Sequence, residues 1–219
     1  MNLLKLMILM FLSGCTVFPT NNIAPGYLET FKALKNAVVG FEDGTYISRE
    51  LVNNIPYASM TLKIGKGPKG LMILESIRND ELTWVSADPI YLVIKSGRII
   101  KTEGLDNDLI NVVFPEIDFQ KIVNQDIKPF RAFYSYSNPE LNNLELEFSY
   151  SLKGKERVTI LDQIFELNLV HEEVKNHKLG WKFTNKYWVD ENYFIRKSNQ
   201  TINPKIPFFE IEVTKKPSK

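Results

Sequence analysis

Hydrophobic and polar residues alternate along much of the second half of the chain. This is the pattern of a β-strand that buries one face and exposes the other. The clearest case is segment 144–150 (LELEFSY), in which every second residue is apolar or aromatic. Segment 208–213 (FFEIEV) repeats the alternation, with Glu210 and Glu212 on its polar face. Both segments predict antiparallel strands with a solvated outer side.

Shorter strands are predicted on both sides of segment 144–150, separated by turns rich in Gly, Pro, Asn and Asp. Residues 95–98 (KSGR) predict a tight hairpin turn and residues 190–192 (DEN) a second turn. Residues 106–113 (DNDLINVV) are interpreted as one or two helical turns. The other predicted strands are 57–64, 71–77, 82–86, 90–94, 98–102, 157–161, 163–174, 180–189 and 193–198.

A change of period near the start of the chain predicts one helix, over residues 25–40 (PGYLETFKALKNAVVG). Pro25 suits a first helical turn and Gly40 a C-terminal stop. Its apolar face could pack on a sheet, which we prefer because the polar face is short and mixed in sign, or lie on a membrane surface. The predicted fold class is therefore mainly β: an antiparallel, barrel-like or strongly curved sheet with an N-terminal helix.

The first residues have a different character. Residues 3–12 (LLKLMILMFL) form an apolar run with one charge, Lys5, which is too short for a membrane-spanning helix of about 20 residues. Such a run suits the signal of a secreted protein. It ends in LSGCT, which resembles the lipobox of bacterial lipoproteins, in which a cysteine thiol is joined to a lipid. Cys15, the one cysteine of the chain, is the predicted lipidation site.

This resemblance divides the chain into a signal peptide over residues 1–14, a lipidated tether over 15–24 and a single β-rich domain over 25–219. Two or three acyl chains hold a protein firmly on a bilayer. Thr16 follows the cysteine where an aspartate would imply retention in the inner membrane. The lipobox resemblance therefore implies an outer-membrane location, with the domain expected to face the periplasm.

Charge and length narrow the functional classes. Removal of residues 1–14 leaves 205 residues, with 26 Lys and Arg against 26 Asp and Glu. A balanced charge gives no reason to expect nucleic acid or a cationic partner. With Cys15 acylated no disulfide can form, so stability must come from burial.

No catalytic or metal-binding signature is present. His171 and His177 are six residues apart, which places them about 20 Å apart on a strand, so we expect no metal site. The carboxylate pairs Glu145/Glu147 and Glu210/Glu212 have a spacing compatible with a glycoside hydrolase, but lie on faces predicted to be solvated. We therefore expect neither an enzyme nor a cofactor.

Aromatic side chains are the best candidates for contact with a sugar, because their faces stack on sugar rings. In segment 130–136 (FRAFYSY), Phe130, Tyr134 and Tyr136 share one strand face. If that face is open, these three residues are the candidate glycan contacts. Each of the three tryptophans is expected in the core instead.

Several short stretches resemble, in their order, the group 4 capsule or YjbF-type family of exopolysaccharide lipoproteins. The resemblance covers most of the chain that follows the signal. It implies a mainly β fold with no established catalytic residues, and Cys15 is the one position to which it transfers a role. The matching stretches are IPYASM (55–60), WVSAD (84–88), GRIIKT (97–102), GL (104–105), YWVD (187–190) and RKS (196–198).

The resemblance implies a non-enzymatic accessory factor in the assembly or export of a capsule or exopolysaccharide. Expected partners are membrane lipid through acylated Cys15, the polysaccharide, an outer-membrane export channel and periplasmic proteins of the same pathway. Two alternatives make different structural predictions. A carrier of lipid or lipoprotein in a half-open β-barrel requires a continuous apolar cavity. A polysaccharide-modifying enzyme requires two carboxylates that converge in a cleft.

Overall fold

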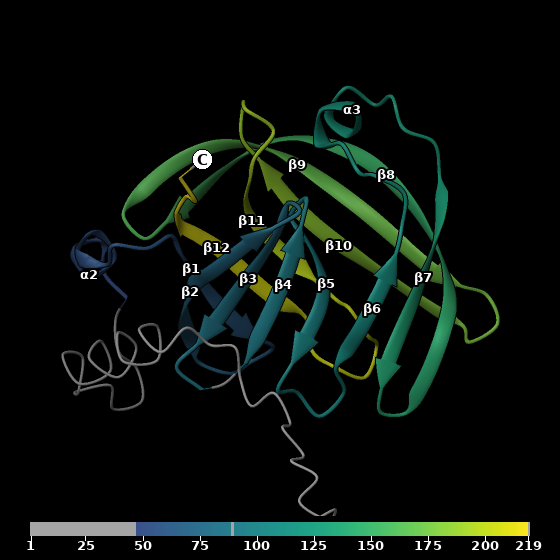
Figure 1. Cartoon of the computed structure of the whole chain (residues 1–219). Helices are drawn as coiled ribbons and strands as arrows, with labels where there is room; N and C mark the ends of the chain where they lie inside the picture. The colour runs from purple at the N-terminus through teal and green to yellow at the C-terminus, as the bar shows by residue number, and fades with distance from the viewer. Residues whose placement is uncertain (1–46, 89, 219) are drawn as a thin grey trace, which may run out of the picture. The chain divides into compact units, whose positions relative to one another are not determined.

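The computed structural model describes residues 47–88 and 90–218. The predicted signal peptide, Cys15, the tether and the helix over 25–40 lie outside the described residues. In the described part, twelve strands form a single antiparallel sheet, in the order β5-β4-β3-β2-β1-β12-β11-β10-β9-β8-β7-β6 (Figure 1). The strands are β1 (Ser59–Ile64), β2 (Lys69–Arg78), β3 (Glu81–Ser86), β4 (Tyr91–Lys95), β5 (Arg98–Glu103), β6 (Leu109–Val113), β7 (Phe130–Ser137), β8 (Glu140–Ile160), β9 (Gln163–Asn176), β10 (Trp181–Val189), β11 (Ile195–Gln200) and β12 (Phe209–Lys215).

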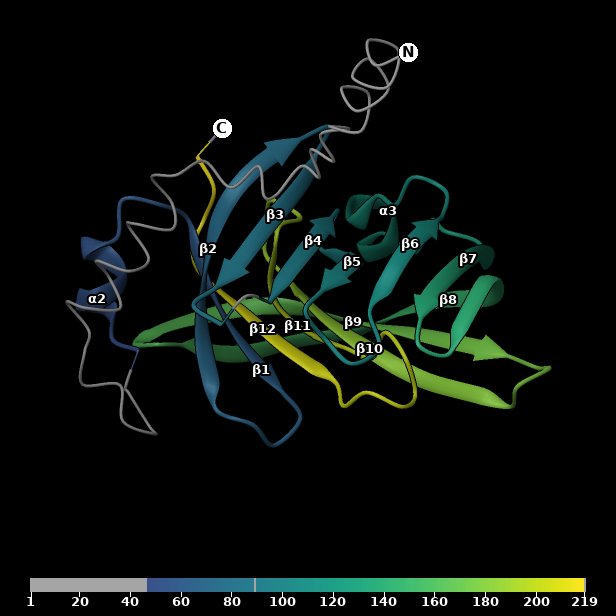
Figure 2. The ribbon, with the colours of Figure 1, turned by 60° about the horizontal axis from the view of Figure 1, so that its bottom comes forward.

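The sheet curls until its two edge strands, β5 and β6, lie beside each other (Figures 1 and 2). Hydrogen bonds that involve side chains link the two strands near the loop that connects them. Thr102 on β5 donates to Asp108 at 2.8 Å and accepts from the amide of Leu109 at 2.9 Å. The result is a nearly closed, barrel-shaped sheet, which confirms the predicted fold class.

Every second side chain along the strands points inward, and these side chains fill the interior of the barrel. Its main core contains aliphatic residues from β1, β2 and β4 and aromatic residues from β7 and β8, among them Leu92, Tyr136 and Phe148. Phe148 is 1% exposed, as the alternation of segment 144–150 predicts. A second cluster joins Val170 and Tyr187 to a short helix, α3 (Phe119–Val123).

The predicted turn at 95–98 is confirmed. Lys95 pairs with Arg98 across the β4–β5 hairpin. Ser96 and Gly97 both have positive φ angles, of 47° and 73°. Two successive positive φ angles characterise the turn whose twist matches that of paired strands, and glycine adopts them without steric cost.

The β8–β9 hairpin is long enough to reach beyond its neighbours (Figure 1). Near its tip it contacts β12 and the helix α2 (Arg49–Asn54). Arg49 fixes this contact, donating to Asp162 at 2.8 Å and to the carbonyl oxygens of Thr214 and Ile160 at 3.0 and 3.2 Å. Apolar residues of the hairpin form a third cluster with Trp188.

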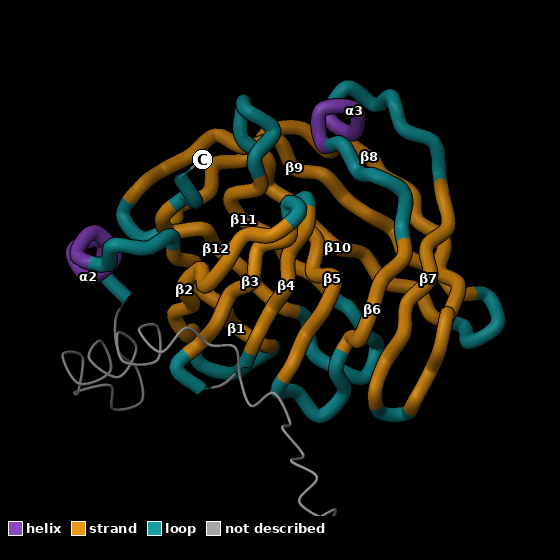
Figure 3. The backbone as a smooth tube through the Cα atoms, in the orientation of Figure 1, coloured by secondary structure: helices purple, strands orange, loops and turns teal. Residues whose placement is uncertain are grey.

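Two local predictions are wrong. Residues 106–113 do not form helical turns, because the chain from Leu109 pairs with β7 (Figure 3). Glu212 lies on the polar face of β12 but is only 5% exposed, because it is enclosed by Lys69 from β2 and Lys197 from β11. Both outcomes depend on contacts distant in sequence. The sequence pattern also did not indicate α2 or α3.

Candidate functional site

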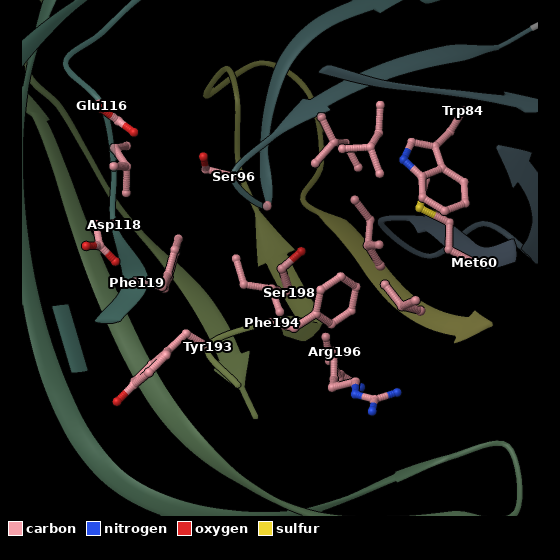
Figure 4. Close-up of a pocket in the computed structure, with 18 of the residues that line it drawn as sticks. Met60, Trp84, Ser96, Glu116, Asp118, Phe119, Tyr193, Phe194, Arg196 and Ser198 are labelled. Carbon is pink, nitrogen blue, oxygen red and sulfur yellow. The ribbon is translucent and has the colours of Figure 1, made fainter. Parts of the chain in front are cut away.

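One end of the barrel contains a cavity of about 570 Å³, which lies within the size range of small-molecule sites. Its wall comes from strands β1, β3, β4, β11 and β12. Its rim comes from the β4–β5 turn, the β10–β11 turn and the segment that leads into α3. Figure 4 shows the side chains that line it.

One side of the cavity is apolar. Trp84 and Met60 lie together there (Figure 4), and Leu82 and Ile94, which face each other on β3 and β4, complete this side. Trp84 is 2% exposed, and its indole N–H has no acceptor among the described residues. This is unusual, since buried tryptophan N–H groups normally have a partner.

The opposite side carries polar groups beside apolar ones: Glu116 and Asp118 lie across the cavity from Trp84, next to Phe119 (Figure 4). Asp118 caps α3, because its Oδ1 accepts from the amide of Gln120 at 2.8 Å. Lys121 also lines the cavity. This side therefore offers charges of both signs.

Arg196, which also lines the cavity, is held in place by Asp190. Its Nε donates to Asp190 Oδ2 at 2.9 Å, and Lys216 Nζ donates to the same oxygen at 2.8 Å. Burial raises the pKa of Asp190, but hydrogen bonds from Lys216, the Phe194 amide and Arg196 outweigh it, so the pKa lies below its ordinary value. Asp190 therefore stays ionised at neutral pH.

A buried ion pair lies in the barrel interior next to the cavity. Arg98 Nη2 donates to Glu172 Oε2 at 2.7 Å, and the two side chains are 4% and 0% exposed. Arg98 also donates to the hydroxyl groups of Tyr134 and Tyr150. Burial lowers the pKa of Arg98, but the attraction of Glu172 outweighs it and the net shift is upward. Arg98 therefore stays charged.

Gln200 joins this polar interior to the cavity. Its Nε2 donates to the carbonyl oxygen of Gly97 and to Ser198 Oγ, both at 2.9 Å. Its Oε1 accepts from the amide of Ile99 at 3.0 Å. Gly97 and Ser198 line the cavity, so the wall at this point is fixed by hydrogen bonds among β5, β11 and the β4–β5 turn.

The predicted glycan contacts lie elsewhere. Tyr134 and Tyr136 are 4% and 1% exposed and face the core, where Tyr136 donates to the carbonyl oxygen of Ile202 at 2.7 Å. Phe130 is half-buried and stacks on Phe148 with ring centroids 5.4 Å apart. The face that these three residues share is therefore not open, and we do not propose a glycan contact there. Cys15 lies outside the described residues.

Neither carboxylate pair considered from the sequence lines the cavity. Glu145 and Glu147 bind Arg131, each at 3.3 Å. Glu210 and Glu212 lie beside two lysines. Across residues 47–88 and 90–218 no group of three His, Cys, Asp or Glu side chains could hold a metal ion. In the same ranges no helix is long and apolar enough to cross a membrane.

The sequence pattern did not indicate the cavity residues. Trp84 was correctly expected in the core, but alternation does not show that its N–H would lack an acceptor. Glu116 and Asp118 come from the irregular segment that leads into α3 and Arg196 from the start of β11, and the curvature of the sheet brings both regions to one cavity. A part of the lining, among it Ile94, Ser96 and Tyr193, does stand at the ends of predicted elements, where loops and turns gather.

Comparisons with known proteins agree on one family. The family model described as group 4 capsule polysaccharide lipoprotein gfcB, YjbF matches residues 31–214. The lipoprotein GfcB of Escherichia coli K12 is 24% identical over 197 residues, which cover 88% of each chain. The lipoprotein YjbF of the same strain is 24% identical over 176 residues, covering 78% of this chain and 80% of YjbF.

One solved structure has the same fold. It is the crystal structure of the hypothetical lipoprotein YmcC from Escherichia coli K12, with a TM-score of 0.72 and 23% sequence identity. The similarity covers 88% of this chain and 96% of that one.

Proposed function

We propose that this chain, which belongs to the YjbF family of group 4 capsule polysaccharide lipoproteins, is a non-enzymatic accessory factor. It would act in the assembly or export of a capsule or exopolysaccharide. The observation that carries the proposal is the family match over residues 31–214. The similarity to GfcB and YjbF along most of their length supports it.

A binding role is supported by the kind of site that the barrel offers. The carboxylate pairs considered for catalysis are engaged in ion pairs outside the cavity. The cavity combines an apolar side with a polar side, as sites that hold a small molecule or a chain segment do. A protein with such a cavity could hold part of the polymer, or of its precursor, while other proteins act on it.

The proposed location is the outer membrane, with the barrel on its periplasmic side. The LSGCT sequence supports lipid attachment at Cys15, and Thr16 supports transfer to the outer membrane. At this location, an export channel and periplasmic proteins of the same pathway are within reach. The polysaccharide and these proteins are the proposed partners.

A lipid carrier is the second candidate function, and the apolar side of the cavity favours it. Trp84, Met60 and Ile94 would suit an acyl chain. A carrier requires a continuous apolar cavity. Here the unpaired N–H of Trp84 and the charged residues on the opposite side interrupt the apolar lining. We therefore rank this function below a role in polysaccharide assembly.

The test is the amount of cell-surface polysaccharide in a strain that lacks the protein. We expect the amount to fall and to recover when the wild-type chain is restored. Restoration with Cys15→Ala should fail, and this variant should carry no acyl label. An unchanged amount of polymer in the deletion strain would refute the proposed function, and acyl label on Cys15→Ala would refute the anchor.

A further inference from the structure

The unpaired N–H of Trp84 identifies one end of the cavity as a place for an acceptor. In contrast, the indole N–H of Trp188 donates to Glu156 Oε2 at 2.8 Å. Trp84 has no such partner among the described residues, and it faces the cavity (Figure 4). An unpaired buried donor destabilises the folded chain, so an acceptor atom bound at this point would recover that free energy.

The neighbours of Trp84 favour an uncharged acceptor that brings no donor of its own, such as a carbonyl group. Met60, Leu82 and Ile94 provide only methyl, methylene and thioether groups. A hydroxyl group would bring a donor for which these side chains hold no oxygen acceptor. A carboxylate would bring a buried charge without a counter-ion. A carbonyl only accepts and an indole only donates, so the two match. A methyl group attached to the carbonyl would pack on the aliphatic side chains.

The opposite side of the cavity suits a neutral polyhydroxyl body. Glu116 and Asp118 can accept from hydroxyl groups. Lys121 can donate to them. A phosphate or carboxylate would meet the two acidic side chains, and an ammonium group would meet Lys121. Each hydroxyl of an uncharged group can donate to an acidic side chain or accept from Lys121.

We infer that the cavity binds an acetylated sugar unit. The acetyl carbonyl accepts from Trp84 Nε1, its methyl packs on Met60, Leu82 and Ile94, and the sugar hydroxyls face Glu116 and Asp118. The volume of about 570 Å³ lies within the range of sites for ligands of this size. The inference rests on the proposed function, because a polysaccharide in assembly is the source of such a unit.

The first experiment compares two trisaccharides. The full chain, reconstituted in phospholipid vesicles, is titrated by calorimetry with tri-N-acetylchitotriose and with cellotriose, which carries a hydroxyl in place of each acetamido group. We expect the acetylated trisaccharide to bind at least about tenfold more tightly, which corresponds to about 1.4 kcal/mol. Equal affinity for the two sugars would overturn the inference without any variant.

Two matched variants test the role of the indole N–H. Trp84→Phe keeps an aromatic ring and removes the donor, so the preference for the acetylated sugar should fall about tenfold, close to equal affinity. Trp188→Phe makes the same change outside the cavity and should leave the preference unchanged. Thermal melting of both variants shows whether they fold. If Trp84→Phe folds and keeps the preference, Trp84 does not recognise the acetyl group.

A third titration distinguishes the sugar from a lipid. Palmitate is added to the wild type and to Leu82→Trp, which fills the apolar end. If palmitate binds, Leu82→Trp weakens it and neither trisaccharide binds, the cavity takes a lipid chain and the inference is wrong. In that case a fall in polymer in the deletion strain would still support the proposed function. Conversely, sugar binding with unchanged polymer would refute that function alone.

Discussion

The burial of individual side chains follows the alternation of the sequence where it depends only on the face of the sheet on which the residue lies. Phe148 was predicted to be buried, and the structure confirms this. Its ring stacks with those of Phe130 and Tyr134, and the guanidinium of Arg98 lies 4.7 Å from its ring centre. Glu212 was predicted to be exposed and is not, because two lysines from other strands enclose it. Alternation identifies the face on which a residue lies, but not what covers that face.

The core position of Phe148 makes it sensitive to charge. In Phe148→Glu the stacked contacts are lost and a carboxylate enters the barrel interior, so we expect a loss of several kcal/mol, on the order of 3–5 or more. Circular dichroism during thermal melting measures it. A wild-type melting curve for this variant would be incompatible with the described core.

Glu212 should make stability depend on pH. Burial raises its pKa, but hydrogen bonds from Lys197 and Lys69, both at 2.7 Å, outweigh burial and lower it. A lowered folded-state pKa contributes stability above the unfolded value of about 4.3, and this contribution is lost as the pH falls through the folded pKa. In urea unfolding at pH 3 to 7, Glu212→Gln should therefore reduce the pH dependence.

The same variant should cost about 1–3 kcal/mol at pH 7, where the charged hydrogen bonds are present. Glu210→Gln is the control, because Glu210 lies 3.8 Å and 3.9 Å from the same lysines and should have a smaller effect. Identical pH profiles for wild type and Glu212→Gln would contradict the assigned ion pairs.

Strands and turns were predictable where local chemistry determines them. The β4–β5 turn was found from KSGR, because positive φ angles at Ser96 and Gly97 fit those residues. Strand β6 was missed, because DNDLINVV has no strict alternation and becomes a strand only by pairing with β7. An edge strand with a single neighbour depends most on such distant partners.

Gly97 should be a sensitive position for the cavity wall. A Cβ atom there would lie 1.8 Å from Ile195 Cδ1, at a φ of +73°. Gly180 has a similar φ of +65°, with nothing within 4 Å of an added Cβ. We expect Gly180→Ala to cost about 1 kcal/mol from backbone strain alone, and Gly97→Ala to cost more. Denaturant midpoints measure the difference, and equal midpoints would mean that the turn and β11 do not meet.

At the scale of the whole molecule, a curved antiparallel sheet was predictable, but its closure was not. The number of strands with polar outer faces indicated a barrel-like fold. Which strands become edges, and that a cavity forms at one end, depend on register and curvature, which no local pattern specifies. Arg98 shows this best, because its partners Glu172, Tyr134 and Tyr150 come from three other strands.

The Arg98–Glu172 pair ties edge strand β5 to β9 across the interior. Arg98→Met leaves Glu172 buried without a counter-ion, so we expect a loss of about 3–5 kcal/mol. Arg131→Met removes an arginine with a 62% exposed side chain and two carboxylate partners, and should cost about 0–1 kcal/mol. Urea denaturation of both variants tests the comparison, and similar losses would argue against the buried pair.

In the proposed function, this lipoprotein supports polysaccharide assembly through the cavity at the end of its barrel. To test this role, a deletion strain is restored with Leu82→Trp or with Thr83→Trp and cell-surface polymer is measured. Leu82 lines the cavity, and Thr83, the next residue on β3, points to the other face of the sheet. We expect Thr83→Trp to restore the polymer and Leu82→Trp to fail, at equal protein levels. Full restoration by Leu82→Trp would contradict this role of the cavity.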